Sequence, residues 1–323
     1  MYKIRQRITI FFISLIAIGF SIQLVINTQN NNKKINYEVN SSVMNYPTSI
    51  NIPKTTNATP IIIDKNSKEP ENNAQQLIDS TTITPNNLSY EHWKDWPVFP
   101  DYVSEELKVL YKQGINNGND PHAFSIFGDC HSLPEVFLGI FDNNPSFVLT
   151  LEPSVKETIK NFQGSFNRYS PTVKVGTTEG ALLWSLWNDN EEGFCLPNEN
   201  AIDCELRVHK PSIVIIQVGT HYESRNEQYM IKIIEKLLDH KIAPIIVTKA
   251  DNRDLDEHIN KTLVKLAVKY DLPVWNFWAS VQDLETKGIN PKDNMYLSEE
   301  GYKIHQNDGI KVLDIIWHAL NSD

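Results

Sequence analysis

Residues 127–132, Phe-Gly-Asp-Cys-His-Ser, place a thiol and an imidazole directly after an apolar run of the chain. Cysteine is intrinsically more nucleophilic than serine, and a nearby imidazolium can stabilise its thiolate. A further imidazole, His221, follows a later apolar run in the stretch Gly219-Thr220-His221. A pair formed by Cys130 and His221 would suit acyl transfer or thioester chemistry, provided that the fold brings the two side chains together.

The elements that must position these residues alternate between short apolar runs and segments with helical periodicity. The runs at 212–218 and 243–248 are almost continuously apolar, as expected for parallel strands that are covered on both faces. The segments 227–241, 254–270 and 309–320 carry apolar residues on one helical face. We therefore predict a three-layer α/β/α domain with right-handed crossovers. The candidate strands are residues 123–127, 172–175, 212–218, 243–248 and 273–277.

Polar residues follow the candidate strands, at the sheet edge where open parallel sheets bind ligands. These blocks are residues 128–132, 176–178 and 219–221, and a late polar loop spans 293–302. Their order resembles the SGNH/GDSL hydrolase family, which has a Gly-Asp-Ser block, a glycine block, a Gly-x-Asn block and an Asp-x-x-His block. The resemblance covers roughly residues 123–320 and is carried best by FSIFGDCHSLPEVF, IIQVGTHYES and DNMYLSEEGY. It implies a mostly parallel, five-stranded, flavodoxin-like sheet.

The resemblance also implies a mechanism, in which a serine attacks an ester carbonyl and a histidine, oriented by an aspartate, serves as the base. Backbone and side-chain N–H groups of the first three blocks would line the oxyanion hole. In this chain Cys130 stands at the serine position, His221 at the asparagine position and Tyr296 at the histidine position. A tyrosine, with an ordinary pKa of about 10, cannot replace the imidazole base near neutral pH. The positions that keep the family residue are Gly128, Asp129, Gly176, Gly219 and Asp293.

Three interpretations of these departures remain open. In the first, Cys130 and His221 rebuild the chemistry, which requires the strand ends to meet around a sulfur that solvent can reach. In the second, nucleophile and base are both lost. In the third, Ser132 or His305 is recruited instead. If the chain is active, the resemblance implies an acyl esterase or O-acyl transferase acting on cell-surface glycan or similar esters. The alternative is a catalytically degenerate SGNH-fold protein that binds glycan or acyl ligands without turnover.

The composition excludes some function classes. The formal net charge is −10, whereas a nucleic-acid binder usually presents a basic face, so we expect no nucleic-acid partner. No group of His, Cys and Glu has metal-ligand spacing, and no phosphate-binding glycine loop follows a strand, so we expect no metal and no cofactor. Cys195 and Cys204 lie in one polar stretch, where a disulfide and two separate thiols are both compatible with the spacing.

The N-terminal part of the chain differs from the rest. Lys3, Arg5 and Arg7 precede residues 8–26, which are uncharged and long enough for a helix to cross a bilayer. We predict that residues 1–26 form a signal anchor whose partner is the lipid bilayer, with the folded domain extracytoplasmic. Residues 27–88, rich in Asn, Thr, Ser and Pro, are predicted to be a disordered linker, and residues 89–323 the α/β domain.

Overall fold

The computed structural model describes residues 89–188, 193–218, 226–250 and 256–322, all within the compact unit Leu77–Asp323. The predicted anchor and linker, at 1–26 and 27–88, lie outside the described residues. Within the part that the structure describes, no helix combines the length and the apolar character that crossing a membrane would need.

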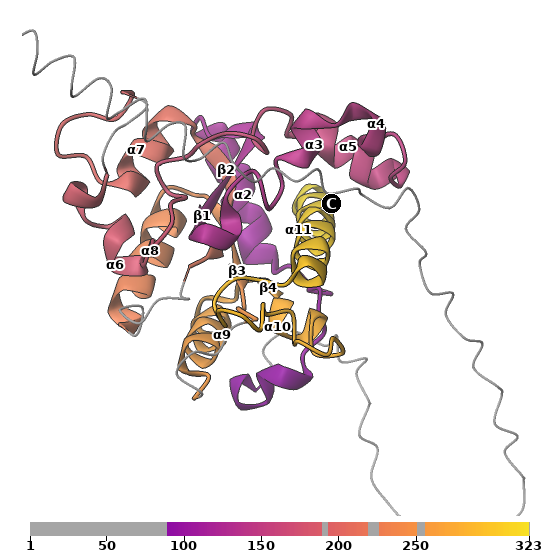
Figure 1. The fold of residues 1–323 in the computed structure, drawn as a ribbon. Coiled ribbons are helices and arrows are strands. Elements are labelled where there is room, and N and C mark those ends of the chain that lie inside the picture. Colours follow the sequence, from indigo (N-terminus) through magenta and orange to yellow (C-terminus); the bar gives the residue numbers. More distant parts are fainter. Residues whose placement is uncertain (1–88, 189–192, 219–225, 251–255, 323) are drawn as a thin grey trace, which may run out of the picture. The chain divides into compact units, whose positions relative to one another are not determined.

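Four parallel strands form the sheet, in the order β1-β2-β3-β4 (Figure 1). Every residue of β2 and β3 is buried, which agrees with their Val- and Ile-rich sequences. The strands are β1 (Asp120–Gly128), β2 (Pro211–Gln217), β3 (Ala243–Val247) and β4 (Val274–Trp275).

The predicted fifth strand, at 172–175, is reduced to one parallel bridge between Gly128 and Val173. Gly128 N donates to Thr172 O at 3.0 Å and Gly128 O accepts from Lys174 N at 3.4 Å. Both bonds leave Gly128 on the side away from its β2 neighbour, because the N–H and C=O of one residue in a parallel strand point the same way. The prediction of five strands is therefore only partly correct. The bridged segment lies on the other side of β1 from β2, so β1 has a parallel neighbour on each side.

Helices cover both faces of this sheet (Figure 1). On one face α8 and α9 pack against β3 and against each other, and α6 packs on α8. On the other face α2 packs against β2, β3 and α11, and α5 packs on α11. The three layers predicted from the sequence are thus present. The helices are η2 (Tyr90–Asp95), α2 (Glu105–Asn116), η3 (Cys130–Ser132), α3 (Ile140–Asn143), α4 (Pro145–Val148), α5 (Pro153–Asn161), α6 (Glu179–Leu182), η4 (Ser185–Trp187), α7 (Ala201–Val208), α8 (Glu227–Asp239), α9 (His258–Tyr270), α10 (Phe277–Ser280) and α11 (Glu299–Asn321).

Helix α11 begins ten residues earlier than the apolar pattern at 309–320 predicts. Ser298 caps it by accepting a hydrogen bond from Gly301 N at 3.0 Å, and two glutamates occupy the first turn, where the helix dipole favours negative charge. The first half of the helix is mostly polar, so the apolar periodicity of the sequence did not reveal where the helix begins. As a result the late loop at 293–298 leads straight into α11, which fixes that loop against the sheet.

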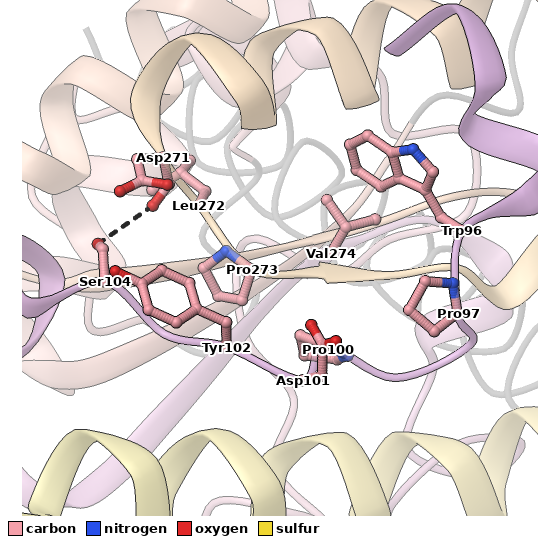
Figure 2. Close-up of a pocket in the computed structure, with 10 residues that line it drawn as sticks. All are labelled: Trp96, Pro97, Pro100, Asp101, Tyr102, Ser104, Asp271, Leu272, Pro273 and Val274. Carbon is pink, nitrogen blue, oxygen red and sulfur yellow. Dashed lines mark hydrogen bonds between the residues drawn. The ribbon is translucent and has the colours of Figure 1, made fainter. Parts of the chain in front are cut away.

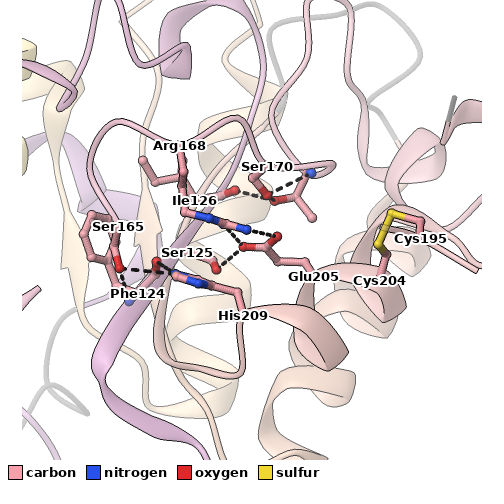
Figure 3. Close-up of polar contacts among 11 residues, drawn as sticks. Phe124, Ser125, Ile126, Ser165, Arg168, Ser170, Cys195, Cys204, Glu205 and His209 are labelled. Atoms are coloured by element: carbon pink, nitrogen blue, oxygen red, sulfur yellow. Dashed lines mark hydrogen bonds and ion pairs between the residues drawn. A yellow bond between two sulfur atoms is a disulfide. The ribbon is translucent and has the colours of Figure 1, made fainter. Parts of the chain in front are cut away.

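A buried ion pair ties the middle of β1 to α7 (Figure 3). Glu205, fully buried, accepts hydrogen bonds from both terminal nitrogens of Arg168 and from the Ser125 hydroxyl. Burial raises the pKa of Glu205, but Arg168 outweighs burial and the pKa is lowered overall. One residue before this glutamate, Cys204 forms a disulfide with Cys195, which settles the alternative that the spacing left open.

Candidate active site

The turn after β1 carries the candidate nucleophile. Asp129 caps the short helix η3, because its Oδ1 accepts a hydrogen bond from His131 N at 3.0 Å. The backbone folds back so tightly that a Cβ at Gly128 would lie 2.0 Å from Ser132 Oγ. Only glycine fits at that position, and this explains the glycine of the first block. Cys130 is thereby held two residues beyond the carboxyl end of β1.

Cys130 lies in the turn just beyond the carboxyl end of β1, at the edge of the sheet where open parallel sheets bind ligands. Its side chain is only 3% exposed, and its thiol is not part of the disulfide. The expectation of a sulfur open to solvent is therefore wrong. A bulky ester could reach it only if the groups around it moved.

Residues of the late loop and of α11 lie beside this turn. His131 Nε2 lies 2.9 Å from Met295 O, and the His131 ring meets the rings of Tyr296 and Tyr302 edge-on, with centroids 6.3 and 6.2 Å away. Burial, and then the negative charge of a Cys130 thiolate, raise the pKa values of both tyrosines. The fold thus brings the first block and the last block together, as the resemblance implies.

Asp293, the expected orienting carboxylate, is engaged with its own loop. Its Oδ1 accepts hydrogen bonds from the backbone N–H groups of Met295 and Tyr296, both at 2.9 Å, and its Oδ2 accepts one from Asn290 at 3.1 Å. The two backbone bonds lower the pKa of Asp293, and the charge of His131 adds to the effect. The described hydrogen bonds of the Asp293 carboxylate therefore hold its own loop in shape. The imidazole that interacts electrostatically with this carboxylate is that of His131.

The remaining predicted positions have mixed outcomes. Gly176 has a φ of 83°, a conformation that favours glycine, and it follows the bridge at Val173. Gly219 and His221 lie outside the described residues. Whether His221 faces Cys130 thus stays a prediction.

The third interpretation of the sequence has no support in the geometry. Ser132 is 1% exposed and its Oγ lies against Gly128. His305 is 2% exposed, and its Nε2 lies 2.9 Å from the Gln217 side-chain oxygen. Its ring stacks on Phe137, with centroids 4.2 Å apart. Burial lowers its pKa well below the ordinary value, so His305 is a neutral core residue.

Sequence reasoning missed a buried cation at this site. Lys249 Nζ donates to Asp129 Oδ2 at 3.2 Å and to Gln217 O at 2.7 Å, and its side chain is 5% exposed. A lysine directly after a buried apolar strand was the available signal, because that position is the carboxyl end of β3. The imidazole of His131 was noted in the sequence, but its burial, at 2% exposure, was not predicted, since nothing in its sequence neighbours indicates it.

A separate pocket lies at the opposite end of the sheet, before β4 (Figure 2). Its cavity volume is about 50 Å³, and Pro273 and Val274 lie between the rings of Tyr102 and Trp96. Because this pocket is at the amino end of β4 and Cys130 is at the carboxyl ends, the two are distinct sites in the fold.

Comparison with known proteins gives structural neighbours only: no family model matches the chain, and no curated protein matches it. A protein described as lipolytic and of the G-D-S-L family, from Desulfitobacterium hafniense, is 17% identical over 59% of this chain and 99% of its own, with a TM-score of 0.40. A GDSL-like lipase from Bacteroides thetaiotaomicron is 15% identical over 65% of this chain and 98% of its own, with a TM-score of 0.37.

A third similar structure, described as an acylhydrolase from Bacteroides fragilis, is 16% identical over 66% of this chain and 100% of its own, with a TM-score of 0.37. Two of these three proteins are described as GDSL-type, the type that the sequence blocks of this chain resemble. All three TM-scores lie below 0.5, so the fold assignment rests on the parallel strand order and the helical layers of this chain.

Proposed function

We propose that the described domain is an SGNH/GDSL-type acyl-ester hydrolase or O-acyl transferase in which Cys130 takes the place of the serine. The observation that carries the proposal is the position of the thiol, in the turn beyond β1 whose next residue, His131, contacts the last-block loop. Because Cys130 is 3% exposed, the proposal requires the groups around the thiol to move before an ester can bind. Cell-surface glycan esters are the substrate class that the family resemblance suggests.

The proposed step is nucleophilic acyl transfer. The Cys130 sulfur forms a bond to the ester carbonyl carbon, and the carbon–oxygen bond to the alcohol breaks. The alcohol leaves with the proton that an imidazole has taken from the thiol. Water, or an acceptor hydroxyl, then cleaves the thioester and returns the thiol. His221 is the base that the block order suggests, and His131 is the described imidazole beside the last block.

The test is turnover of p-nitrophenyl acetate by the purified full chain. We expect Cys130→Ala to lose the activity and the thioester mass in the intact protein. The pair His221→Ala and His131→Ala identifies the base, since only the variant lacking the base should lose kcat with little change in KM. Equal turnover by wild type and Cys130→Ala would remove the thiol from the mechanism.

A second candidate is a domain of the same fold that binds a glycan or acyl ligand without turnover. Two observations favour it: the 3% exposure of Cys130, and a tyrosine at the position of the base. The double variant Cys130→Ser with Tyr296→His separates the candidates. Esterase activity that appears only in the double variant would mean that the site is intact but silent in the natural chain.

We also propose that residues 8–26 anchor the chain in a bilayer, with the domain on the extracytoplasmic side. The uncharged run after a basic N-terminus supports the anchor, and the Cys195–Cys204 disulfide supports an oxidising compartment. We expect alkaline carbonate to leave the full chain in the membrane and to release a chain lacking residues 1–26. Release of both forms would contradict the anchor.

A further inference from the structure

One buried ammonium group connects the carboxyl ends of three strands. Lys249 follows β3, and its Nζ donates to Gln217 O at the end of β2 and to Asp129 Oδ2 just beyond the end of β1. The lysine side chain is 5% exposed and the aspartate side chain is fully buried. A charge pair so buried is retained only where both partners are compensated.

The lysine itself is held from behind by helix α9. Lys249 N donates to Asn260 Oδ1 at 2.7 Å, and Asn260 Nδ2 donates to Lys249 O at 2.9 Å. Asn260 is 2% exposed, so these bonds are shielded from water. The ammonium group therefore reaches the strand ends from a fixed backbone.

Asp129 connects Lys249 to the turn that carries the Cys130 thiol, because its two carboxylate oxygens bind different partners. While Oδ2 is bound by Lys249, Oδ1 accepts the hydrogen bond from His131 N that caps η3. His131 in turn is docked on Met295 O of the last-block loop. Removing the lysine charge would take away a buried counter-charge of the carboxylate and so weaken the restraint on the cap of the turn.

We propose that Lys249 is a positioning residue for Cys130, acting through Asp129. The lysine does not touch the reacting atoms, and it keeps the turn of Cys130 closed against the last-block loop. The consequence of this positioning for acyl transfer rests on the proposed function, whereas its consequence for the accessibility of the thiol does not.

The test measures how fast iodoacetamide alkylates Cys130 in the native full chain, by intact mass. The other two cysteines are joined in the disulfide, so alkylation reports on Cys130. We expect Lys249→Met to increase the rate at least tenfold, because the turn opens. Lys249→Met combined with Asp129→Asn should return the rate to within about threefold of wild type, because the buried negative charge is gone and an amide oxygen still caps the turn.

A matched control is Lys265→Met, which removes an exposed lysine paired with Glu227 and should leave the rate unchanged. If Lys249→Met does not fold, Asp129→Ala and Asp129→Asn carry the test, since only the alanine removes the cap. A folded Lys249→Met chain with the wild-type rate overturns the proposal. So does a double variant as reactive as Lys249→Met alone, or an Asp129→Ala chain that reacts like Asp129→Asn.

Failure of the positioning role and failure of the proposed function give different results. If Cys130→Ala keeps full esterase turnover while Lys249→Met still exposes the thiol, the thiol mechanism fails and the positioning role stands. If Cys130→Ala abolishes turnover while Lys249→Met changes neither alkylation nor kcat, the positioning role fails and the thiol mechanism stands.

Discussion

Two buried acid–base pairs lie along β1, and their surroundings differ. Glu205 and Asp129 are both fully buried carboxylates, one beside the middle of the strand and one beyond its end. Glu205 receives two bonds from the Arg168 fork and one from Ser125 (Figure 3). Asp129 is paired with the single ammonium group of Lys249, which it shares with Gln217 O, and it also accepts a hydrogen bond from the backbone N–H of His131.

The polar groups near the two pairs also differ in how completely they are hydrogen-bonded. Around Glu205, His209 Nε2 lies 3.2 Å from Ser165 Oγ and 3.1 Å from Phe124 O, so these groups have partners. Near Asp129, three buried polar atoms have no hydrogen-bond partner among the described residues: Ser132 Oγ, Gln217 Nε2 and His305 Nδ1. Such atoms are rare in protein cores and need an explanation. Within the described part of the chain, the polar groups around the Glu205 pair are therefore more completely hydrogen-bonded than those at the strand ends.

The largest effect expected from this comparison is on the Glu205 side. Arg168→Met should lower the free energy of unfolding by about 3–5 kcal/mol, because it leaves a fully buried carboxylate without its counter-charge. Urea unfolding of the full chain at pH 7 measures the loss. Arg168→Met combined with Glu205→Gln should recover most of it. If the double variant is no more stable than the single one, the pair is not the source of the effect.

The same two regions show how far the sequence alone predicts this molecule. The buried strands β2 and β3 could be predicted from the sequence, because continuous runs of Val and Ile are typical of parallel strands that are covered on both faces. The meeting of the first block with the last block was expected from the family resemblance of the sequence blocks, and the contacts of His131 confirm it. Lys249 and Arg168 could not be assigned, since each pairs with a carboxylate more than 30 residues away in the sequence. The contact of Tyr302 with His131 could not be predicted either, because Tyr302 belongs to the first turns of α11, whose start the apolar pattern did not reveal.

A second test concerns the disulfide next to Glu205. Replacing Cys195 and Cys204 by serine should cost roughly 2–3 kcal/mol, the loop-closure contribution of a bridge that spans about ten residues. Urea unfolding of the oxidised and the double-serine chains measures the difference. Alkylation of Cys130 should be unchanged in the serine variant if the two regions are independent. A large increase in alkylation would mean that they are coupled, and the comparison would fail.

A third test examines the tight turn at the end of β1. Gly128→Ala should cost about 1–3 kcal/mol, because the new methyl group would lie 2.0 Å from Ser132 Oγ and 2.4 Å from Ser132 Cβ. Thermal unfolding measures the loss. Adding Ser132→Gly removes both of these atoms and should restore at least half of the stability. No recovery in the double variant would mean that the turn relaxes around the methyl group in some other way.

The smallest expected effect is a pH dependence of the free energy of unfolding, to which one histidine in each region contributes. Burial lowers the pKa of His209 near Glu205, with Arg168 adding to the effect, and burial lowers the pKa of His305 near Asp129 further. A histidine whose pKa is lowered by folding binds fewer protons in the folded state. Its contribution to stability is therefore complete above the unfolded pKa of about 6.5 and is lost as the pH falls toward the folded value.

We expect the free energy of unfolding to fall between pH 6.5 and 5 by up to about 1.4 kcal/mol per pH unit for each of these histidines. His209→Gln should remove the smaller share of this slope, since the side chain of His209 is only partly buried, and His305→Gln the larger share. Urea unfolding at half-unit pH steps measures both slopes against wild type. Equal slopes in wild type and His305→Gln would mean that His305 accepts a proton as readily in the fold as in water. The strand-end region would then be better hydrated than its burial indicates, and the contrast with the Glu205 region would have to rest on its hydrogen bonds alone.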